Sequence, residues 1–552
     1  MRTAYSIECE HSPREALFRS ESGLSANLNS SFLYSPGSMT APTFLIGFMA
    51  AGKTSVGRAL AQATGRRFID LDDVVAQAGE PVADLVARDE QEFRRREARA
   101  LEQIVATASD GPIIATGGGA AAWGGNLARM RAAGCVIALG VDPEAAIARA
   151  GANSGRPLLA RAHELAAERA PVYRRAHAVV DTNGRSIAEV TANVHSVENV
   201  WAQHPDATVV ALGSRSYPIT VSETFQLPAL AGATRSAVIT DRNVAAALGH
   251  RLPDDAIVIE AGEPSKSFAN YERLCAELIA RGLDRNSAII AVGGGVVGDL
   301  AGFVAATLYR GIAIIQVPTT IVAMSDAAIG GKTAIDTAAG KNLVGAFWQP
   351  RRVACALDTL STLPPRERRA GFGELWKYGL LDGRELWNAV ATCSDWARSD
   401  QQIPPPPALH EVIARSAAYK AAIVGRDELE RTGQRALLNL GHTVGHAIET
   451  RSGLHHGEAV ALGLVAACRV SAALGLASAT VETEVLDVLR RTGLPTDLDD
   501  YISDDTLDIL RVDKKRVANS VRFIAVRTVG QCEPVEIEVT TLRRILRGPG
   551  RP

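Results

Sequence analysis

Residues 43–54, Thr-Phe-Leu-Ile-Gly-Phe-Met-Ala-Ala-Gly-Lys-Thr, decide the fold of the first half of the chain. An apolar run leads into residues 47–54, which match the pattern G-x-x-x-x-G-K-[ST], and residues 53–65 continue with a helical period. A strand, a glycine-rich turn and a helix in this order surround phosphate groups with backbone N–H donors. The lysine neutralises β- and γ-phosphate oxygens, and the following hydroxyl reaches a magnesium ion. The stretch therefore predicts a Mg²⁺-nucleotide site formed by Gly47, Gly52, Lys53 and Thr54.

Outward from this stretch, short apolar runs alternate with longer Ala-, Leu- and Arg-rich helical stretches as far as about residue 182. This alternation is typical of βα units on a parallel sheet. Residues 1–40 are rich in serine and small polar residues and have no period, so we expect a flexible leader. A helical pattern then ends in a polar seam near Gln203, and a fresh strand pattern follows. We therefore expect the first α/β domain to span residues 41–203.

Further polar signals follow the glycine-rich turn in a fixed order. Asp70 and Asp72 close the second strand, where alternation places them on one side, able to hold Mg²⁺ through water and to accept a substrate hydroxyl. An arginine-rich helix, a triple glycine after a strand, and two more arginine segments come next. Each arginine alone would be a solvated helix residue, but the ordered series resembles the shikimate kinase family over about residues 42–190.

This resemblance implies ATP with Mg²⁺ and shikimate as phosphoryl acceptor. Shikimate carries a carboxylate, which suits bidentate arginine. The sequence departs from the family pattern at Arg149-Ala-Gly-Ala-Asn153, where the family often has R-T-G-G-N. The alternative is another small-molecule P-loop kinase, such as a gluconate kinase. The resemblance implies that shikimate is bound by Asp72, Arg94, Gly118 and Arg169, and that Asp72 orients the attacking hydroxyl. It implies that Asp70 helps to position Mg²⁺ and that Arg149 lies along the adenine. It also implies that Arg156 reaches the transferring phosphoryl group on a mobile lid.

A second nucleotide signal begins at residues 287–299, Ser-Ala-Ile-Ile-Ala-Val-Gly-Gly-Gly-Val-Val-Gly-Asp. A strand that runs into a glycine-rich turn and a helix lets the backbone approach a pyrophosphate. Asp241 and Asn243 end one upstream strand, and Glu263 and Lys266 follow another, at places where ribose hydroxyls can be held. After about Pro364 the period is almost wholly helical. We therefore expect an α/β lobe over residues 204–363 and an α-helical lobe over residues 364–552.

Four of the chain's 11 histidines fall within residues 442–456. His442 and His446 are one helical turn apart and share a face, as paired metal ligands do. The concentration of histidines favours a metal or proton-transfer site over packed side chains. A carboxylate must complete an open His₂Glu zinc site, and Glu374, in another helical stretch, is the candidate.

Long runs at residues 293–311, 316–336, 340–350, 373–379 and 437–449 resemble the 3-dehydroquinate synthase family over about residues 207–540. The resemblance implies Zn²⁺, or alternatively Co²⁺, held by Glu374, His442 and His456. It implies NAD bound by Asp241, Asn243, Glu263, Lys266, Gly294, Gly295, Val296, Asp299, Thr319, Thr320 and Thr362. It further implies that a phosphorylated seven-carbon acid, 3-deoxy-D-arabino-heptulosonate 7-phosphate, is bound by Arg310, Asp326, Lys332, Lys341, Asn342, Lys377, Lys420, Arg435, Asn439, His446 and Lys514, with Lys332, Lys377, Arg435, Asn439 and His446 as catalytic residues.

The implied synthase reaction is redox-neutral overall. A substrate alcohol is oxidised and later reduced again with NAD, phosphate leaves in between, and the ring opens and recloses by an aldol step. One departure is the segment between Lys420 and Arg435, which is about one residue longer than usual. A polyol dehydrogenase would not need the phosphate-binding lysines, and a related sugar-phosphate cyclase would differ at substrate contacts. A catalytically silent scaffold would lack key groups that are present here.

The composition limits the classes of partner. The chain has 59 Lys and Arg against 61 Asp and Glu, so no strong field attracts nucleic acid or an acidic membrane, and no apolar run is long enough to span one. Seven scattered cysteines without CxxC spacing indicate buried thiols in a reducing cytoplasm. The synthase resemblance implies a homodimer. The expected fold is α/β: a P-loop kinase domain with a parallel sheet, then a two-lobe synthase with a Rossmann-like NAD-binding lobe and an α-helical metal-binding lobe.

Overall fold

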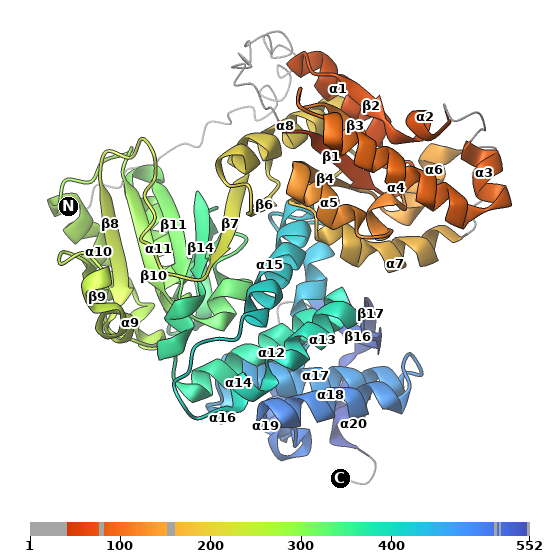
Figure 1. Ribbon diagram of the computed structural model, residues 1–552. Helices are drawn as coiled ribbons and strands as arrows, with labels where there is room; N and C mark the ends of the chain where they lie inside the picture. Colours follow the sequence, from red (N-terminus) through yellow and green to blue (C-terminus); the bar gives the residue numbers. More distant parts are fainter. Residues whose placement is uncertain (1–40, 77–81, 152–160, 513–515, 518–519, 549–552) are drawn as a thin grey trace, which may run out of the picture. The chain divides into compact units, whose positions relative to one another are not determined.

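The first sheet consists of five parallel strands in the order β2-β3-β1-β4-β5 (Figure 1). Apolar side chains alternate between its two faces, so each face needs a helical cover. Phe44 and Ile46 pack with α4 and α5 on one face, whereas Leu45 packs with α1 and α8 on the other. The elements are β1 (Thr43–Gly47), α1 (Lys53–Thr64), β2 (Phe68–Asp70), α2 (Leu71–Ala76), α3 (Val82–Arg88), α4 (Glu90–Thr107), β3 (Ile113–Ala115), α5 (Asn126–Ala133), β4 (Cys135–Gly140), α6 (Pro143–Ala150), α7 (Ala162–Arg174), β5 (Ala178–Asp181) and α8 (Ile187–Gln203).

This computed structural model describes residues 41–76, 82–151, 161–512, 516–517 and 520–548. The expected leader, residues 1–40, lies outside the described residues, as do Arg156 and Lys514. The described residues all belong to one unit, Met39–Pro552.

The second sheet has the order β6-β7-β14-β11-β10-β8-β9, with only β6 antiparallel to its neighbour. Ile239 and Ile289 pack with α10 and α11 on one face, and Val238 and Ile290 pack with Phe225 and Leu248 on the other. The elements are β6 (Thr208–Val210), β7 (Tyr217–Ser222), β8 (Ser236–Asp241), α9 (Arg242–Leu248), β9 (Ile257–Ile259), α10 (Phe268–Ala280), β10 (Ala288–Gly293), α11 (Gly295–Thr307), β11 (Ala313–Pro318), the hairpin β12 (Lys332–Thr337) and β13 (Gly340–Phe347), and β14 (Arg352–Ala356).

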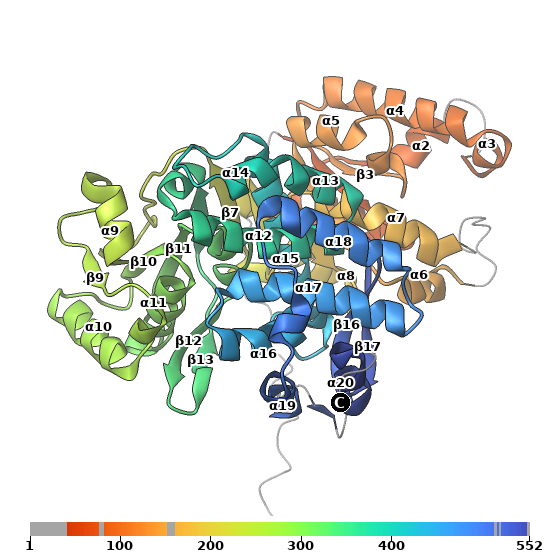
Figure 2. The ribbon, with the colours of Figure 1, turned by 90° about the horizontal axis from the view of Figure 1, so that it is seen from below.

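The remaining lobe is built around α17, whose apolar residues are almost all buried and which packs against α12, α16 and α18 (Figure 2). Its helices are α12 (Pro365–Asp382), α13 (Arg384–Thr392), α14 (Ser394–Arg398), α15 (Ala408–Arg426), α16 (His442–Ser452), α17 (His456–Ala473), α18 (Ala479–Thr492), α19 (Asp504–Val512) and α20 (Val539–Arg547). The α/β architecture expected from the sequence is confirmed. The nearly all-helical expectation after Pro364 was incomplete, because β15 (Arg516–Val517), β16 (Ser520–Thr528) and β17 (Gln531–Glu538) form an antiparallel sheet there.

Glycines let the central helices approach closely. A Cβ atom built on Gly457 would lie 1.7 Å from the Ala370 carbonyl oxygen, and one on Gly373 would lie 2.0 Å from the Gly457 carbonyl oxygen. One on Gly463 would lie 1.8 Å from the Gly441 carbonyl oxygen. Since backbone cannot yield as a flexible side chain does, these positions fix how near α17 lies to α12 and to the start of α16.

Helix α15 contacts strands of both sheets. A Cβ atom on Gly425 would lie 3.3 Å from the Ala211 carbonyl oxygen and 3.6 Å from that of Val179, so the helix packs directly on the ends of β5 and β6. At its last residue, Arg426 pairs with Asp142 and lies 3.6 Å from Asp181. The same helix therefore joins the two halves of the unit.

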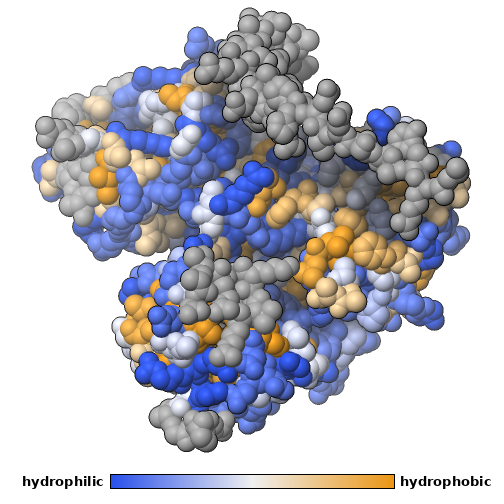
Figure 3. Space-filling view, turned by 180° about the vertical axis from the view of Figure 1, so that it is seen from behind, coloured by the Kyte–Doolittle hydropathy of each residue, from blue (hydrophilic) through white to orange (hydrophobic). Residues whose placement is uncertain are grey.

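Hydrophilic residues cover most of the face that Figure 3 shows, and apolar residues lie among them in smaller groups. Among the described residues, no helix combines the length and the apolar character needed to cross a lipid bilayer.

Candidate active sites

The glycine-rich turn after β1 lines a cavity of about 740 Å³. Gly47 has a φ of +134°, and a Cβ atom there would lie 2.4 Å from the Leu139 carbonyl oxygen of β4, so the turn requires glycine. Lys53 Nζ donates to the carbonyl oxygens of Gly47 and Phe48 at 2.8 and 2.9 Å. Thr54 Oγ1 donates to Asp70 Oδ2 at 2.8 Å, which places two oxygen groups that Mg²⁺ can use as ligands side by side.

Asp72 lines the same cavity from the first turn of α2. The expectation that Asp70 and Asp72 share one side of a strand was wrong in this detail, because β2 ends at Asp70 and the chain turns into a helix. Burial, and next the neighbouring Asp70, raise the pKa of Asp72. Among the described residues, its Oδ1 atom is buried without a hydrogen-bond partner. Such an acceptor is suited to a substrate hydroxyl.

Arg94 and Arg169 are 7% and 9% exposed. Burial raises the pKa of the Glu97 carboxyl even though both arginines lower it. Arg94 Nη1 donates to Glu97 Oε2 at 2.8 Å. A Cβ atom on Gly119 would lie 2.4 Å from Arg94 Nη2, so Gly119 leaves room for this guanidinium group, whereas one on Gly118 would make an ordinary contact with Arg169 Nη1 at 3.7 Å. Arginines are the side chains suited to bind a small carboxylate.

Sequence reasoning missed two contributors to this half. Glu97, which is buried and orients Arg94, stands three residues after it, and that helical spacing was the available signal. Thr182 follows β5 and accepts from Arg149 Nη1 at 2.9 Å, which fixes Arg149 at the cavity wall. No motif marks that threonine.

A second cavity, of about 830 Å³, lies at the carboxyl ends of β8, β10 and β11 and reaches the helical lobe. This edge of a parallel sheet is where nucleotides bind. The expected NAD-binding residues all line it: Asp241, Asn243, Glu263, Lys266, Gly294, Gly295, Val296, Asp299, Thr319, Thr320 and Thr362. Lys266 Nζ lies 2.9 Å from Asp299 Oδ2. Burial raises the pKa of Asp299 to about 6 even though Lys266 lowers it.

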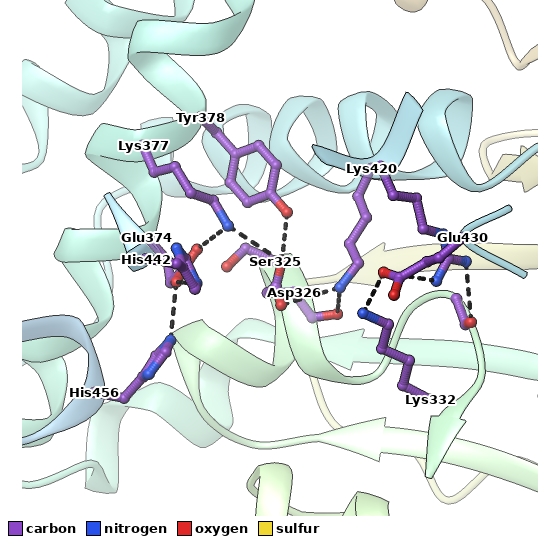
Figure 4. Close-up of polar contacts among 12 residues, drawn as sticks. Ser325, Asp326, Lys332, Glu374, Lys377, Tyr378, Lys420, Glu430, His442 and His456 are labelled. Atoms are coloured by element: carbon purple, nitrogen blue, oxygen red, sulfur yellow. Dashed lines mark hydrogen bonds and ion pairs between the residues drawn. The ribbon is translucent and has the colours of Figure 1, made fainter. Parts of the chain in front are cut away.

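Glu374, His442 and His456 meet at the wall of this cavity that the helical lobe forms (Figure 4). Glu374 Oε1 lies 3.3 Å from His442 Nε2 and 3.2 Å from His456 Nε2. Ligands of one tetrahedral zinc ion are about 3.3 Å apart, so the spacing fits a shared metal. The other ring nitrogens are held: His442 Nδ1 lies 3.0 Å from the Leu440 carbonyl oxygen and His456 Nδ1 lies 2.9 Å from Glu449 Oε2.

A buried ion cluster continues from Glu374, His442 and His456 (Figure 4). Lys377 Nζ lies 2.5 Å from Glu374 Oε2 and 3.4 Å from Asp326 Oδ1. Asp326, in a π-helical turn (Ala323–Ala327), also lies 3.0 Å from Lys420 Nζ and accepts from the Tyr378 hydroxyl at 2.7 Å. Burial alone would raise the pKa of Asp326, but the two lysines outweigh it and hold that pKa below its usual value. Burial lowers the pKa of Lys420 to about 8.

The other expected substrate residues differ in burial and in their contacts. Lys332 in β12 pairs with Glu430, and Lys341 Nζ in β13 lies 3.2 Å from Glu449 Oε1. Asn342 lines the cavity, and Arg435 is buried with Nη2 donating to the Gly330 carbonyl oxygen. His446 is exposed on α16 with its ring 5.0 Å from that of His442, Asn439 is half-buried before α16, and Arg310 is exposed after α11.

Glu449 and Glu430 were not expected from the sequence. Glu449 lies three residues after His446 on the same helix face, so its spacing could have indicated a role beside the metal ligands. Glu430 carries no such signal, because its position depends on how the loop before Arg435 folds.

The fold and its two cavities define the chain as an α/β enzyme in which a P-loop kinase domain is joined to a two-lobe synthase. Family models match accordingly: shikimate kinase at residues 49–198, 3-dehydroquinate synthase N-terminal at residues 256–370 and 3-dehydroquinate synthase C-terminal at residues 371–516. A 3-dehydroquinate synthase of Xylella fastidiosa is 41% identical over 361 residues, which cover 60% of this chain and 90% of that protein.

Solved structures of other synthases match part of the chain. A 2-deoxy-scyllo-inosose synthase complexed with carbaglucose-6-phosphate, NAD⁺ and Co²⁺ is 26% identical, with a TM-score of 0.53, 62% of this chain covered and 99% of that one. A 2-epi-5-epi-valiolone synthase of Streptomyces hygroscopicus, with NAD⁺ and Zn²⁺ bound, is 25% identical, with a TM-score of 0.54 and coverage of 60% and 95%. The chain belongs to the 3-dehydroquinate synthase family and carries a shikimate kinase domain ahead of its synthase part.

Proposed function

We propose that the chain catalyses two reactions of the shikimate pathway. One is the ATP-dependent phosphorylation of shikimate to shikimate 3-phosphate, and the other is the cyclisation of 3-deoxy-D-arabino-heptulosonate 7-phosphate to 3-dehydroquinate with release of phosphate. The observation that carries the second proposal is the convergence of the Glu374, His442 and His456 ligand atoms with the buried lysines at the end of the second cavity.

In the kinase half, Lys53 and the backbone of residues 47–54 hold the nucleotide phosphates, and Thr54 with Asp70 positions Mg²⁺. Arg94 and Arg169 bind the shikimate carboxylate. Asp72 accepts the hydrogen bond of the attacking hydroxyl and holds its oxygen in line with the γ-phosphate. The remaining assignments are Gly118 beside shikimate, Arg149 along the adenine, and Arg156 at the transferring phosphoryl group.

In the synthase half, Glu374, His442 and His456 would hold Zn²⁺ or Co²⁺, and the second cavity would hold NAD. The donor set supports this, because each histidine presents Nε2 while its Nδ1 is fixed. A metal there would polarise a substrate hydroxyl, and NAD would take and return a hydride. Under this proposal the phosphorylated seven-carbon acid is bound by Arg310, Asp326, Lys332, Lys341, Asn342, Lys377, Lys420, Arg435, Asn439, His446 and Lys514. Of these, Lys332, Lys377, Arg435, Asn439 and His446 are catalytic.

The proposal also covers the domain boundaries, the oligomeric state and the location of the chain. We propose domains at residues 41–203, 204–363 and 364–552, a homodimer formed through the synthase half, and a cytoplasmic location. The near-neutral charge supports small-molecule substrates as partners rather than nucleic acid or membrane.

Two assays on the purified full chain test the proposal: ADP formation that depends on shikimate, and phosphate release from the heptulosonate phosphate with NAD and Zn²⁺. Lys53→Ala should abolish only the first activity and His442→Ala only the second. The synthase should also be offered glucose 6-phosphate and sedoheptulose 7-phosphate, as probes for the related cyclases. Turnover of either sugar in place of the heptulosonate phosphate, or no turnover at all, would contradict the assignment.

A further inference from the structure

The loop between α15 and α16 places a carboxylate among the cations of the synthase site. Glu430 pairs with Lys332, and its Oε1 also lies 3.9 Å from Arg435 Nη1. Figure 4 shows Glu430 directed at Lys332, with Lys420 beside it. These cations belong to the group that, under the proposed function, binds the anionic groups of the substrate.

The loop is built to hold this carboxylate. Asp427 Oδ1 accepts from the backbone N–H groups of Arg431 and Thr432 at 2.8 and 3.1 Å, and its Oδ2 accepts from that of Arg435 at 3.4 Å. Burial opposes the charge of Asp427, but these three donors outweigh it and lower its pKa. Within the loop so closed, Glu430 adopts a φ of +57°, a left-handed conformation that costs free energy for a residue other than glycine.

The cations that face Glu430 differ in their freedom. Lys332 is 57% exposed and can follow an anion, whereas Arg435 is 3% exposed and fixed, with Nε unpartnered among the described residues. Glu430 itself is 39% exposed, so its side chain can swing into solvent, and the anion that replaces it then neutralises the buried Arg435. A second anion near Lys332 would repel the carboxylate and favour that movement.

We propose that Glu430 is a built-in competitor that occupies the place of an anionic group of the substrate or product. It leaves when a phosphate-bearing ligand enters, and it competes with inorganic phosphate for Lys332 after the reaction, which speeds the departure of that product. The loop thereby sets substrate affinity and limits product inhibition. This inference deepens the proposed synthase function, but its binding test does not need turnover.

The test measures inorganic phosphate binding to the full chain by isothermal titration calorimetry, in wild type, Glu430→Gln and Glu428→Gln. Glutamine keeps the size and backbone of Glu430 and removes only the charge. Glu428 is the matched control, since it lies in the same loop but pairs with Arg215, 2.7 Å away, and with Gln349. We expect Glu430→Gln to bind phosphate about fivefold more tightly, because a factor of this size corresponds to the free energy of one partly exposed ion pair. We expect Glu428→Gln to bind phosphate as the wild type does.

A kinetic measurement gives a second readout. Glu430→Gln should lower the inhibition constant for inorganic phosphate and the KM by similar factors. The difference in phosphate affinity between Glu430→Gln and the wild type should become smaller at higher salt, because salt screens the Glu430–Lys332 ion pair. Unchanged or weaker phosphate binding in Glu430→Gln would overturn the proposal, since it would mean that Glu430 only positions Lys332. Equal tightening in Glu428→Gln would overturn it as well, because general loop charge would then explain the effect. If phosphate binds as expected but no substrate turns over, the proposed function fails and this inference stands.

Discussion

Replacing Gly457 by alanine should weaken metal binding at the proposed site of Glu374, His442 and His456 without disturbing the kinase. The added Cβ atom would lie 1.7 Å from the Ala370 carbonyl oxygen, so the helices must separate by about 1.7 Å to reach the 3.4 Å at which ordinary contacts begin. Gly457 follows His456 directly on α17, and Glu374 lies one turn after Ala370 on α12. Metal–ligand distances tolerate only about 0.2 Å, so the ligands on the two helices can no longer share one ion.

We expect Gly457→Ala to bind Zn²⁺ at least about 100-fold more weakly, and overpacking to destabilise the helical lobe by roughly 1–3 kcal/mol. Zinc affinity is measured by competition with a chromogenic chelator, and shikimate-dependent ADP formation in the same sample checks that the chain is folded. Gly379→Ala, also on α12, is the control, because its Cβ atom would lie 3.2 Å from Trp387 Cα of α13 and would need only a small adjustment. Wild-type zinc affinity in Gly457→Ala would refute the idea that this glycine contact sets the ligand spacing.

Other predictions concern single groups. Burial lowers the pKa of Lys420 to about 8, so its charge is present below that pH and lost above it. Calorimetry should therefore show phosphate binding that weakens between about pH 7 and 9.5. The weakening should be smaller in Lys420→Gln, which has no charge to lose at this position. Glu449→Gln should weaken Zn²⁺ binding about 10- to 100-fold in the chelator assay, since Glu449 holds His456 Nδ1 at 2.9 Å; unchanged affinity would show that the ring needs no such support. Glu198→Ala should destabilise the kinase domain by about 3–5 kcal/mol in denaturant unfolding, because Glu198 is 1% exposed and its loss leaves Arg66, 2.8 Å away, without its charge partner. A decrease in stability of less than about 1 kcal/mol would contradict this.

Much of this architecture is predictable from the sequence, because the decisive segments are local. A glycine-rich turn between a strand and a helix, as at residues 43–65, combines backbone and side-chain signals within a few residues. The same holds for residues 287–299. Where chemistry depends on such continuous motifs, the residues that the sequence brings together also line one cavity.

The misses arise where distant packing decides the structure. The strand β16 contains the run Phe523-Ile-Ala-Val526, all buried, and a short continuous apolar run looks the same in a buried helix and in a buried strand. Asp72 entered a helix because β2 ends after only three residues. Glu430 reaches Lys332 through a loop whose course depends on Asp427 and Arg435, and no periodicity reports such a contact.

Helix α15 has a consequence for any attempt to separate the two enzymes. Lys420 on this helix reaches Asp326 of the synthase site, and six residues later Arg426 neutralises Asp142 and Asp181 beside the nucleotide cavity of the kinase. Asp142 precedes α6, the helix that carries Arg149. A kinase expressed alone would lose the Arg426 partner of Asp142 and Asp181 and would present an uncovered strand edge, and a synthase expressed alone would present the bare end of α15. Cutting the chain near residue 203 would therefore expose, on each product, the surface that α15 and the kinase sheet bury against each other in the full chain.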